Sequence, residues 1–116
     1  MIPDSTAIGE APDHPVLAEP WRYEIAEFHL VTDPSQAQPP RIDLVLRKGE
    51  QLQRLRFEGV RHVQIEPEFW YPNIGLEILD VSDRGWEGIG VRVNSFEGDE
   101  LRFWARSVVA LEPSAA

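Results

Sequence analysis

The sequence predicts an all-β fold, an antiparallel sandwich or partly open barrel of six or seven strands. Apolar residues recur mainly at every second position, turn residues separate short segments, and no helical pattern extends over ten residues. At 116 residues the chain has room for one domain with one core. An α+β fold with one short helix near residues 50–56 is the alternative.

Composition divides the chain into an arm, a domain and a tail. Residues 1–20 hold four prolines and four acidic residues without any Lys or Arg, which is typical of a flexible acidic arm. Residues 21–112 carry the two-residue alternation and form the predicted single β domain. Residues 113–116, which begin with a proline, form a short tail.

The first strand begins near Trp21 and changes phase along its length. Trp21 and Ile25 fall on one face, whereas Phe28 and Leu30 fall on the other. A β-bulge near residues 26–27 would absorb this one-residue slip and bend the strand.

Residues 41–48 are predicted as the next strand, because Ile42, Leu44 and Leu46 alternate with their neighbours and Gly49 follows. Residues 50–56 are ambiguous. Their leucines change phase, and the spacing also fits one or two helical turns.

Two short strands are predicted in the middle of the chain. Val63 and Ile65 belong to one that stops at Pro67, and Leu76 and Ile78 belong to one that precedes a turn.

Residues 88–112 are predicted as a β-hairpin with its turn at residues 97–100. Its second strand is expected to be long, with alternate residues facing the core: Leu101, Phe103, Ala105, Ser107, Val109 and Leu111.

Composition also excludes several function classes. The chain has no Cys, so disulfide scaffolds, thiolate zinc sites and Cys catalysis are absent. The formal net charge of −9 argues against nucleic-acid and membrane partners. Without a signal peptide or a membrane-spanning apolar run, a cytoplasmic location is expected.

We expect neither cofactor nor metal nor catalysis. The three histidines, His14, His29 and His62, lack metal-ligand spacing, and nucleophile and phosphate-loop motifs are missing. Carboxylates do gather along one stretch, at Glu66, Glu68, Asp80, Asp83 and Glu87. A small hydrolase or sugar-binding module built on them, with Trp70 or Trp86 as a stacking platform, is therefore one alternative.

The strongest binding candidates are aromatic and arginine side chains, which dominate protein interfaces. On the last strand, Trp104 projects from the polar face between two arginines. Alternatively, these aromatic side chains have a structural role. In that case arginine stems or a neighbouring loop cover Trp104, and the loop aromatics close an open end of the sandwich. The candidates are Trp104, Arg102, Arg106, Trp70, Tyr71 and Trp86.

The segment Gly-Leu-Glu-Ile-Leu-Asp-Val-Ser from Gly75, followed by Trp86-Glu87-Gly88-Ile89 and the aromatic strand, resembles a group of small uncharacterised bacterial proteins. Similar small acidic proteins include immunity and accessory partners of bacterial toxins. The resemblance transfers no functional residues. In physical terms, Asp80 or Ser82 could close a side-chain turn, and Trp86 could pack beneath the hairpin.

The function expected from these observations is non-enzymatic binding of another protein, through an acidic surface with Trp and Arg anchors. Net negative charge favours a basic partner. A homo-oligomeric structural protein, in which the last strand pairs across a two-fold axis and exposes Val108, is the other alternative.

Overall fold

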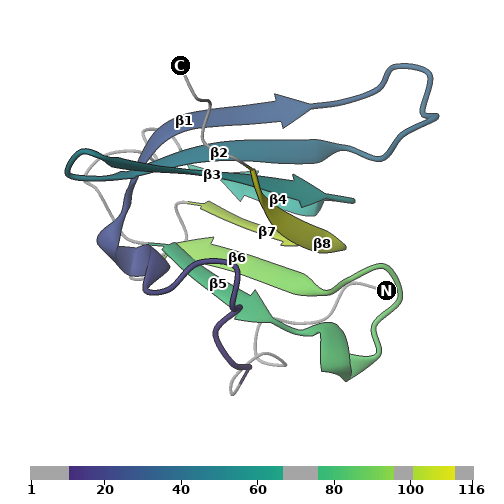
Figure 1. Cartoon of the computed structure of the whole chain (residues 1–116). Coiled ribbons are helices and arrows are strands. Elements are labelled where there is room, and N and C mark those ends of the chain that lie inside the picture. Colours follow the sequence, from purple (N-terminus) through teal and green to yellow (C-terminus); the bar gives the residue numbers. More distant parts are fainter. Residues whose placement is uncertain (1–10, 67–75, 96–100, 112–116) are drawn as a thin grey trace.

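The computed structural model describes residues 11–66, 76–95 and 101–111, and these residues form a sandwich of two four-stranded antiparallel sheets (Figure 1). The all-β prediction is therefore confirmed. The first sheet has the order β1-β2-β3-β8 and the second the order β4-β7-β6-β5. The strands are β1 Glu24–Val31, β2 Arg41–Lys48, β3 Gln51–Glu58, β4 Arg61–Ile65, β5 Leu76–Asp80, β6 Val91–Ser95, β7 Leu101–Ala105 and β8 Ser107–Leu111.

The slip in the first strand is a bulge in β1. Its register against β2 shifts between Ile25 and Glu27, as the change of apolar phase predicts. The strand begins three residues later than predicted: Pro20–Arg22 forms a 3-10 turn, η2, and β1 begins at Glu24. Proline at the first position of this turn fixes the backbone angle that the turn needs.

The alternative helix near residues 50–56 is wrong, because these residues belong to β3. This strand pairs with β2 along its whole length and with β8 over its second half. Leu55 and Phe57 are fully buried, whereas Leu52 is exposed beyond the part that β8 covers. The change of phase therefore reflects the position of the strand in the sheet and not a helical period.

The predicted long strand over residues 101–111 is bent at Arg106 and belongs to both sheets. β7 pairs with β4 in the second sheet, and β8 pairs with β3 in the first. At the bend, the Arg106 amide donates to the Glu58 carbonyl at 2.8 Å. We call this region, residues 58–61 with residues 105–107, the sheet bend.

The sheet bend also reverses which residues face the core. Leu101, Phe103 and Ala105 are buried as predicted, but beyond the bend Val108 is 9% exposed and Val109 is 49% exposed. The predicted inward phase of the last residues, and the predicted exposure of Val108, are therefore wrong. A bend that moves the chain between sheets shifts the alternation by one residue.

Two glycines make the sheet bend possible. Gly59 has a φ of +66°, and a Cβ there would lie 2.8 Å from the Cβ of Arg106. A Cβ on Gly90 would lie 2.6 Å from the Arg106 carbonyl oxygen. Both positions need a residue without a side chain, because backbone and Cβ atoms cannot approach so closely.

The core lies between the two sheets and is built from aliphatic side chains around one aromatic pair. Phe57 of β3 and Phe103 of β7 meet edge to face, with ring centroids 5.1 Å apart. They are surrounded by Ile42, Leu44, Leu46, Leu55, Leu76, Ile78, Val91, Val93, Leu101 and Ala105.

Residues 11–20, the described part of the predicted flexible arm, are attached to the domain. Leu17 belongs to the core. The backbone runs beside β5, where His14 N donates to Ile78 O at 2.8 Å and Asp80 N donates to Pro12 O at 2.8 Å (Figure 1, purple). This pairing occupies the free edge of β5, a common way to protect an edge strand.

The outer face of the first sheet carries ordered ion pairs. Arg56 donates to both carboxylate oxygens of Asp43, at 2.9 and 3.2 Å, and Arg41 lies 3.5 Å from the same carboxylate. The hydrogen bonds from Arg56 hold the pKa of Asp43 below its ordinary value, against the opposing effect of burial. Arg47 and Glu24 pair across β1 and β2 at 3.1 Å.

Within the described residues, no helix has the length and apolar character that membrane crossing requires.

Candidate functional site

The structure describes four of the six predicted binding residues and brings three of them to one face, with Arg106 apart from the others. Arg102 and Trp104 lie on the outer face of the second sheet, and Trp86 lies in the segment that covers part of this face. Arg106 is exposed at the sheet bend. The other two, Trp70 and Tyr71, lie outside the described residues.

Trp104 is a core residue and not an exposed anchor. Its side chain is only 2% exposed and belongs to a second apolar cluster with Val81 and Ile89. The indole of Trp86 meets it edge to face, with centroids 5.7 Å apart and ring planes at 90°. The segment after β5, which includes the 3-10 turn η3 (Ser82–Arg84), folds over this face and turns an outward strand position into a buried one.

Arg92 is the residue that the sequence analysis missed. It lies opposite Trp104 in the β6–β7 register and is 4% exposed. Its guanidinium carbon lies 4.4 Å from the centroid of the Trp104 ring, and its Nε donates to Asn94 Oδ1 at 2.7 Å. Stacking and hydrogen bonding together compensate the cost of burying this charge. We call Arg92, Trp104 and Trp86 the stacked layer.

A row of half-exposed polar side chains runs beside the stacked layer, one from each strand of the second sheet. The register aligns Gln64 of β4, Arg102 of β7, Asn94 of β6 and Glu77 of β5 on the outer face. Arg102 Nε donates to Gln64 Oε1, and Asn94 Nδ2 donates to Glu77 Oε1 at 3.2 Å. Arg92 connects the stacked layer to this row through Asn94. We call the four residues the polar strip.

Two of the carboxylates considered for catalysis, Asp80 and Asp83, make contacts with residues next to them in the sequence. Asp80 Oδ1 accepts hydrogen bonds from Ser82 Oγ at 2.6 Å and from Ser82 N at 2.9 Å, so the predicted side-chain turn is confirmed. These bonds hold the pKa of Asp80 below its ordinary value. Asp83 lies 3.8 Å from the neighbouring Arg84.

Two of the three histidines, His14 and His29, make local contacts as well. His14 Nδ1 accepts from the Val16 amide at 3.0 Å, and His29 Nε2 lies 2.9 Å from Glu27 Oε1. The described residues contain no group of three or more His, Asp or Glu side chains arranged to hold a metal ion.

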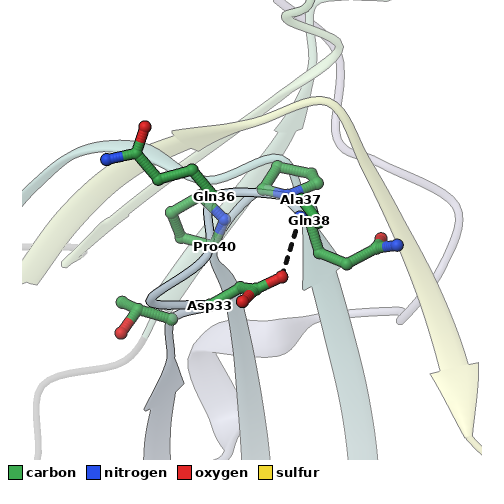
Figure 2. Close-up of a pocket in the computed structure, with 7 residues that line it drawn as sticks. Asp33, Gln36, Ala37, Gln38 and Pro40 are labelled. Atoms are coloured by element: carbon green, nitrogen blue, oxygen red, sulfur yellow. Dashed lines mark hydrogen bonds between the residues drawn. The ribbon is translucent and has the colours of Figure 1, made fainter.

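A shallow hollow lies at the loop between β1 and β2, lined by residues of the 32–40 segment (Figure 2). Its single acidic group is Asp33, which accepts from Ser35 through Oδ1 and from the Gln38 amide through Oδ2 at 3.0 Å. The hydrogen bonds from Ser35 hold the pKa of Asp33 below its ordinary value. The carboxylate caps its own loop, so this hollow offers no poised acid or base.

Comparison of the chain with protein-family models, with curated proteins and with solved structures finds no match.

Proposed function

We propose that this protein is a non-enzymatic binding protein that engages another protein through the polar strip, with Trp86 at its border. The observation that carries the proposal is that four polar side chains from four strands are already held by hydrogen bonds in one row. A surface that is ordered before binding loses little side-chain entropy when a partner docks.

The stacked layer lies beside the strip and supports it. Arg92 is fixed between the Trp104 ring and Asn94, so Asn94 and Glu77 have a rigid base. Arginine and tryptophan are the residue types most enriched at interface hot spots. Among the arginine and tryptophan side chains of the strip and the stacked layer, those of Arg102 and Trp86 are partly accessible to a partner.

The nature of the partner follows from charge and from the sequence resemblance. A net charge of −9 accelerates association with a basic protein through long-range attraction. The resemblance is to small uncharacterised bacterial proteins, and similar small acidic proteins include accessory partners of toxins. This supports a role in which one protein binds another in the cytoplasm.

Site-specific photocrosslinking tests the proposal. A benzophenone amino acid replaces Gln64 on the polar strip, and a second variant carries it at Arg54 on the outer face of the first sheet. Crosslinking in cells of the source organism should capture a partner from the Gln64 position and not from the Arg54 position.

The affinity for the captured partner then identifies the contact. Arg102→Ala should weaken binding by at least tenfold, and the matched change Arg54→Ala should leave it within twofold. Equal effects of the two substitutions, or equal crosslinking from both faces, would contradict binding through the polar strip.

A homo-oligomer remains a second candidate, and one observation favours it. β1 is a sheet edge eight residues long, and Leu30 near its end is 46% exposed beside the exposed Val31. Exposed apolar residues on an edge strand favour pairing with a second copy. Light scattering over a dilution series tests this candidate: a dimer should dissociate on Leu30→Glu, and a monomer at all concentrations would exclude it.

A further inference from the structure

A small hollow at the sheet bend is lined by two arginines. It has a volume of about 210 Å³ and is bounded by Pro39 and Pro40, by Gly59, Val60 and Arg61, and by Gly88 and Arg106. Four separate segments meet here: the end of the β1–β2 loop, the β3–β4 turn, the covering segment before β6 and the junction between β7 and β8. The site is therefore a product of the fold and not of one local motif.

The backbone around the hollow is fixed. The Val60 amide donates to the Pro40 carbonyl at 3.0 Å, and the Arg106 amide donates to Glu58 at the bend. Gly88 has a φ of +72°, and a Cβ there would lie 2.9 Å from Arg61 Nη2. The tip of the Arg61 guanidinium thus lies directly against backbone, in space that a side chain would fill.

The charges in this hollow are not balanced by its own lining. None of its lining residues is acidic, and Arg61 makes no ion pair with any described residue. Arg106 has one long contact, 3.8 Å from Glu58, between two side chains that are about half exposed. By contrast, Arg56 on the neighbouring sheet is held by two short hydrogen bonds to Asp43.

We propose that the hollow at the sheet bend binds a small oxyanion, a phosphate or carboxylate group, between Arg61 and Arg106. Guanidinium groups match both oxyanions in shape and form charge-assisted hydrogen bonds with them. The volume corresponds to about seven waters at ~30 Å³ each, which is enough for one such group with residual hydration. This site goes beyond the proposed protein binding and does not depend on it.

NMR titration of the ¹⁵N-labelled full chain tests the proposal. Sodium phosphate, sodium acetate and sodium chloride are added in parallel at constant ionic strength, and the Nε–Hε signals of the arginines and the amides of Gly59 and Gly88 are followed. Phosphate or acetate should produce saturable shifts at Arg61 and Arg106, and chloride should not. The stronger of the two oxyanions then separates a phosphate-bearing ligand from a carboxylate-bearing one.

Three charge-removing variants make the test specific. Arg61→Gln should weaken oxyanion binding at least tenfold, as should Arg106→Gln, whereas Arg54→Gln on the first sheet should change it less than twofold. Arg61→Gln is the decisive variant, because Arg61 is exposed and makes no ion pair with a described residue, so its loss should leave the protein folded, as the dispersion of the ¹⁵N spectrum will show. Shifts that do not saturate by 50 mM oxyanion, or that Arg54→Gln reduces equally, would overturn the proposal.

Discussion

Replacing Trp104 by alanine should destabilise the protein strongly. The side chain is almost fully buried, and removing a buried Trp costs about 3–5 kcal/mol. That figure includes its edge contact with Trp86, worth roughly 0.5–1.5 kcal/mol, and its stacking with Arg92, worth up to about 2 kcal/mol when desolvated. A loss of about 4 kcal/mol is a large part of the roughly 5–15 kcal/mol that stabilises a domain.

Urea unfolding followed by far-UV circular dichroism measures this loss without relying on the deleted fluorophore. With a denaturant slope of about 2 kcal/mol/M, the midpoint should fall by about 2 M. Trp21→Ala, which removes an exposed indole, is the control and should cost under about 1 kcal/mol. A Trp86/Trp104 double-mutant cycle should give a coupling of about 0.5–1.5 kcal/mol. If Trp104→Ala moved the midpoint no further than Trp21→Ala, the stacked layer would not be part of the core.

Three further predictions concern the sheet bend and the first sheet. Gly90→Ala should cost about 1–3 kcal/mol in urea unfolding, because its Cβ would meet a backbone carbonyl at 2.6 Å. Val108→Asp should lower the unfolding free energy by several kcal/mol, because it places a charge in the core. Val109→Asp, at an exposed position, should change the unfolding free energy by under about 0.5 kcal/mol. Similar losses for the two variants would refute the conclusion that Val108, and not Val109, faces the core. Asp43→Asn should remove the pairing with Arg56, which contributes about 0.5–1 kcal/mol at pH 7. Because the pairing lowers the carboxyl pKa, this difference from wild type should shrink as pH falls from about 5 to about 2, and a difference that grew on acidification would contradict the sign.

The features that the sequence predicts well are those decided by neighbouring residues. The bulge after Ile25 follows from a one-residue slip in the apolar phase. The turn at Asp80 follows from a short acidic side chain two residues before Ser82. In each case the relevant interaction joins residues within a few positions of one another, so the pattern along the chain contains it.

The bend in the last strand could not be predicted in the same way. The run from Val108 to Leu111 is apolar at every position, so either alternate set fits a buried face. Which set is buried depends on Arg106, where the chain leaves one sheet and joins the other. The bend lies at Arg106 because the Arg106 amide pairs with the carbonyl of Glu58, which is far away in the sequence. The alternation of apolar residues along the last strand contains no information about this pairing.

The attachment of residues 11–20 also depends on a distant partner. Proline and acidic residues give this segment the composition of a loose arm, yet its backbone pairs with the edge of β5. Backbone hydrogen bonds to a strand edge require little of the side chains. Composition alone therefore does not distinguish a loose arm from a segment that covers an edge.

The sequence predicts which face of the strand Arg102 and Trp104 occupy, but not what surrounds them there. Arg102 lies on the outer face, as the alternation requires, and takes part in the polar strip. Trp104 shares that face but is covered, because the segment containing Val81 and Ile89 folds over it. The same cover buries Arg92, which in the sequence is an ordinary polar position between two valines.

Net charge is a poor guide to the local surface of this protein. Salt screens exposed charges beyond about 10 Å at 0.1 M, so an oxyanion at the sheet bend experiences mainly the nearby charges of Arg61, Arg106 and Glu58, which lies 3.8 Å from Arg106. An acidic protein can therefore have a locally cationic hollow, because the two arginines of its lining act at contact distance. The total charge affects chiefly the rate at which partners approach.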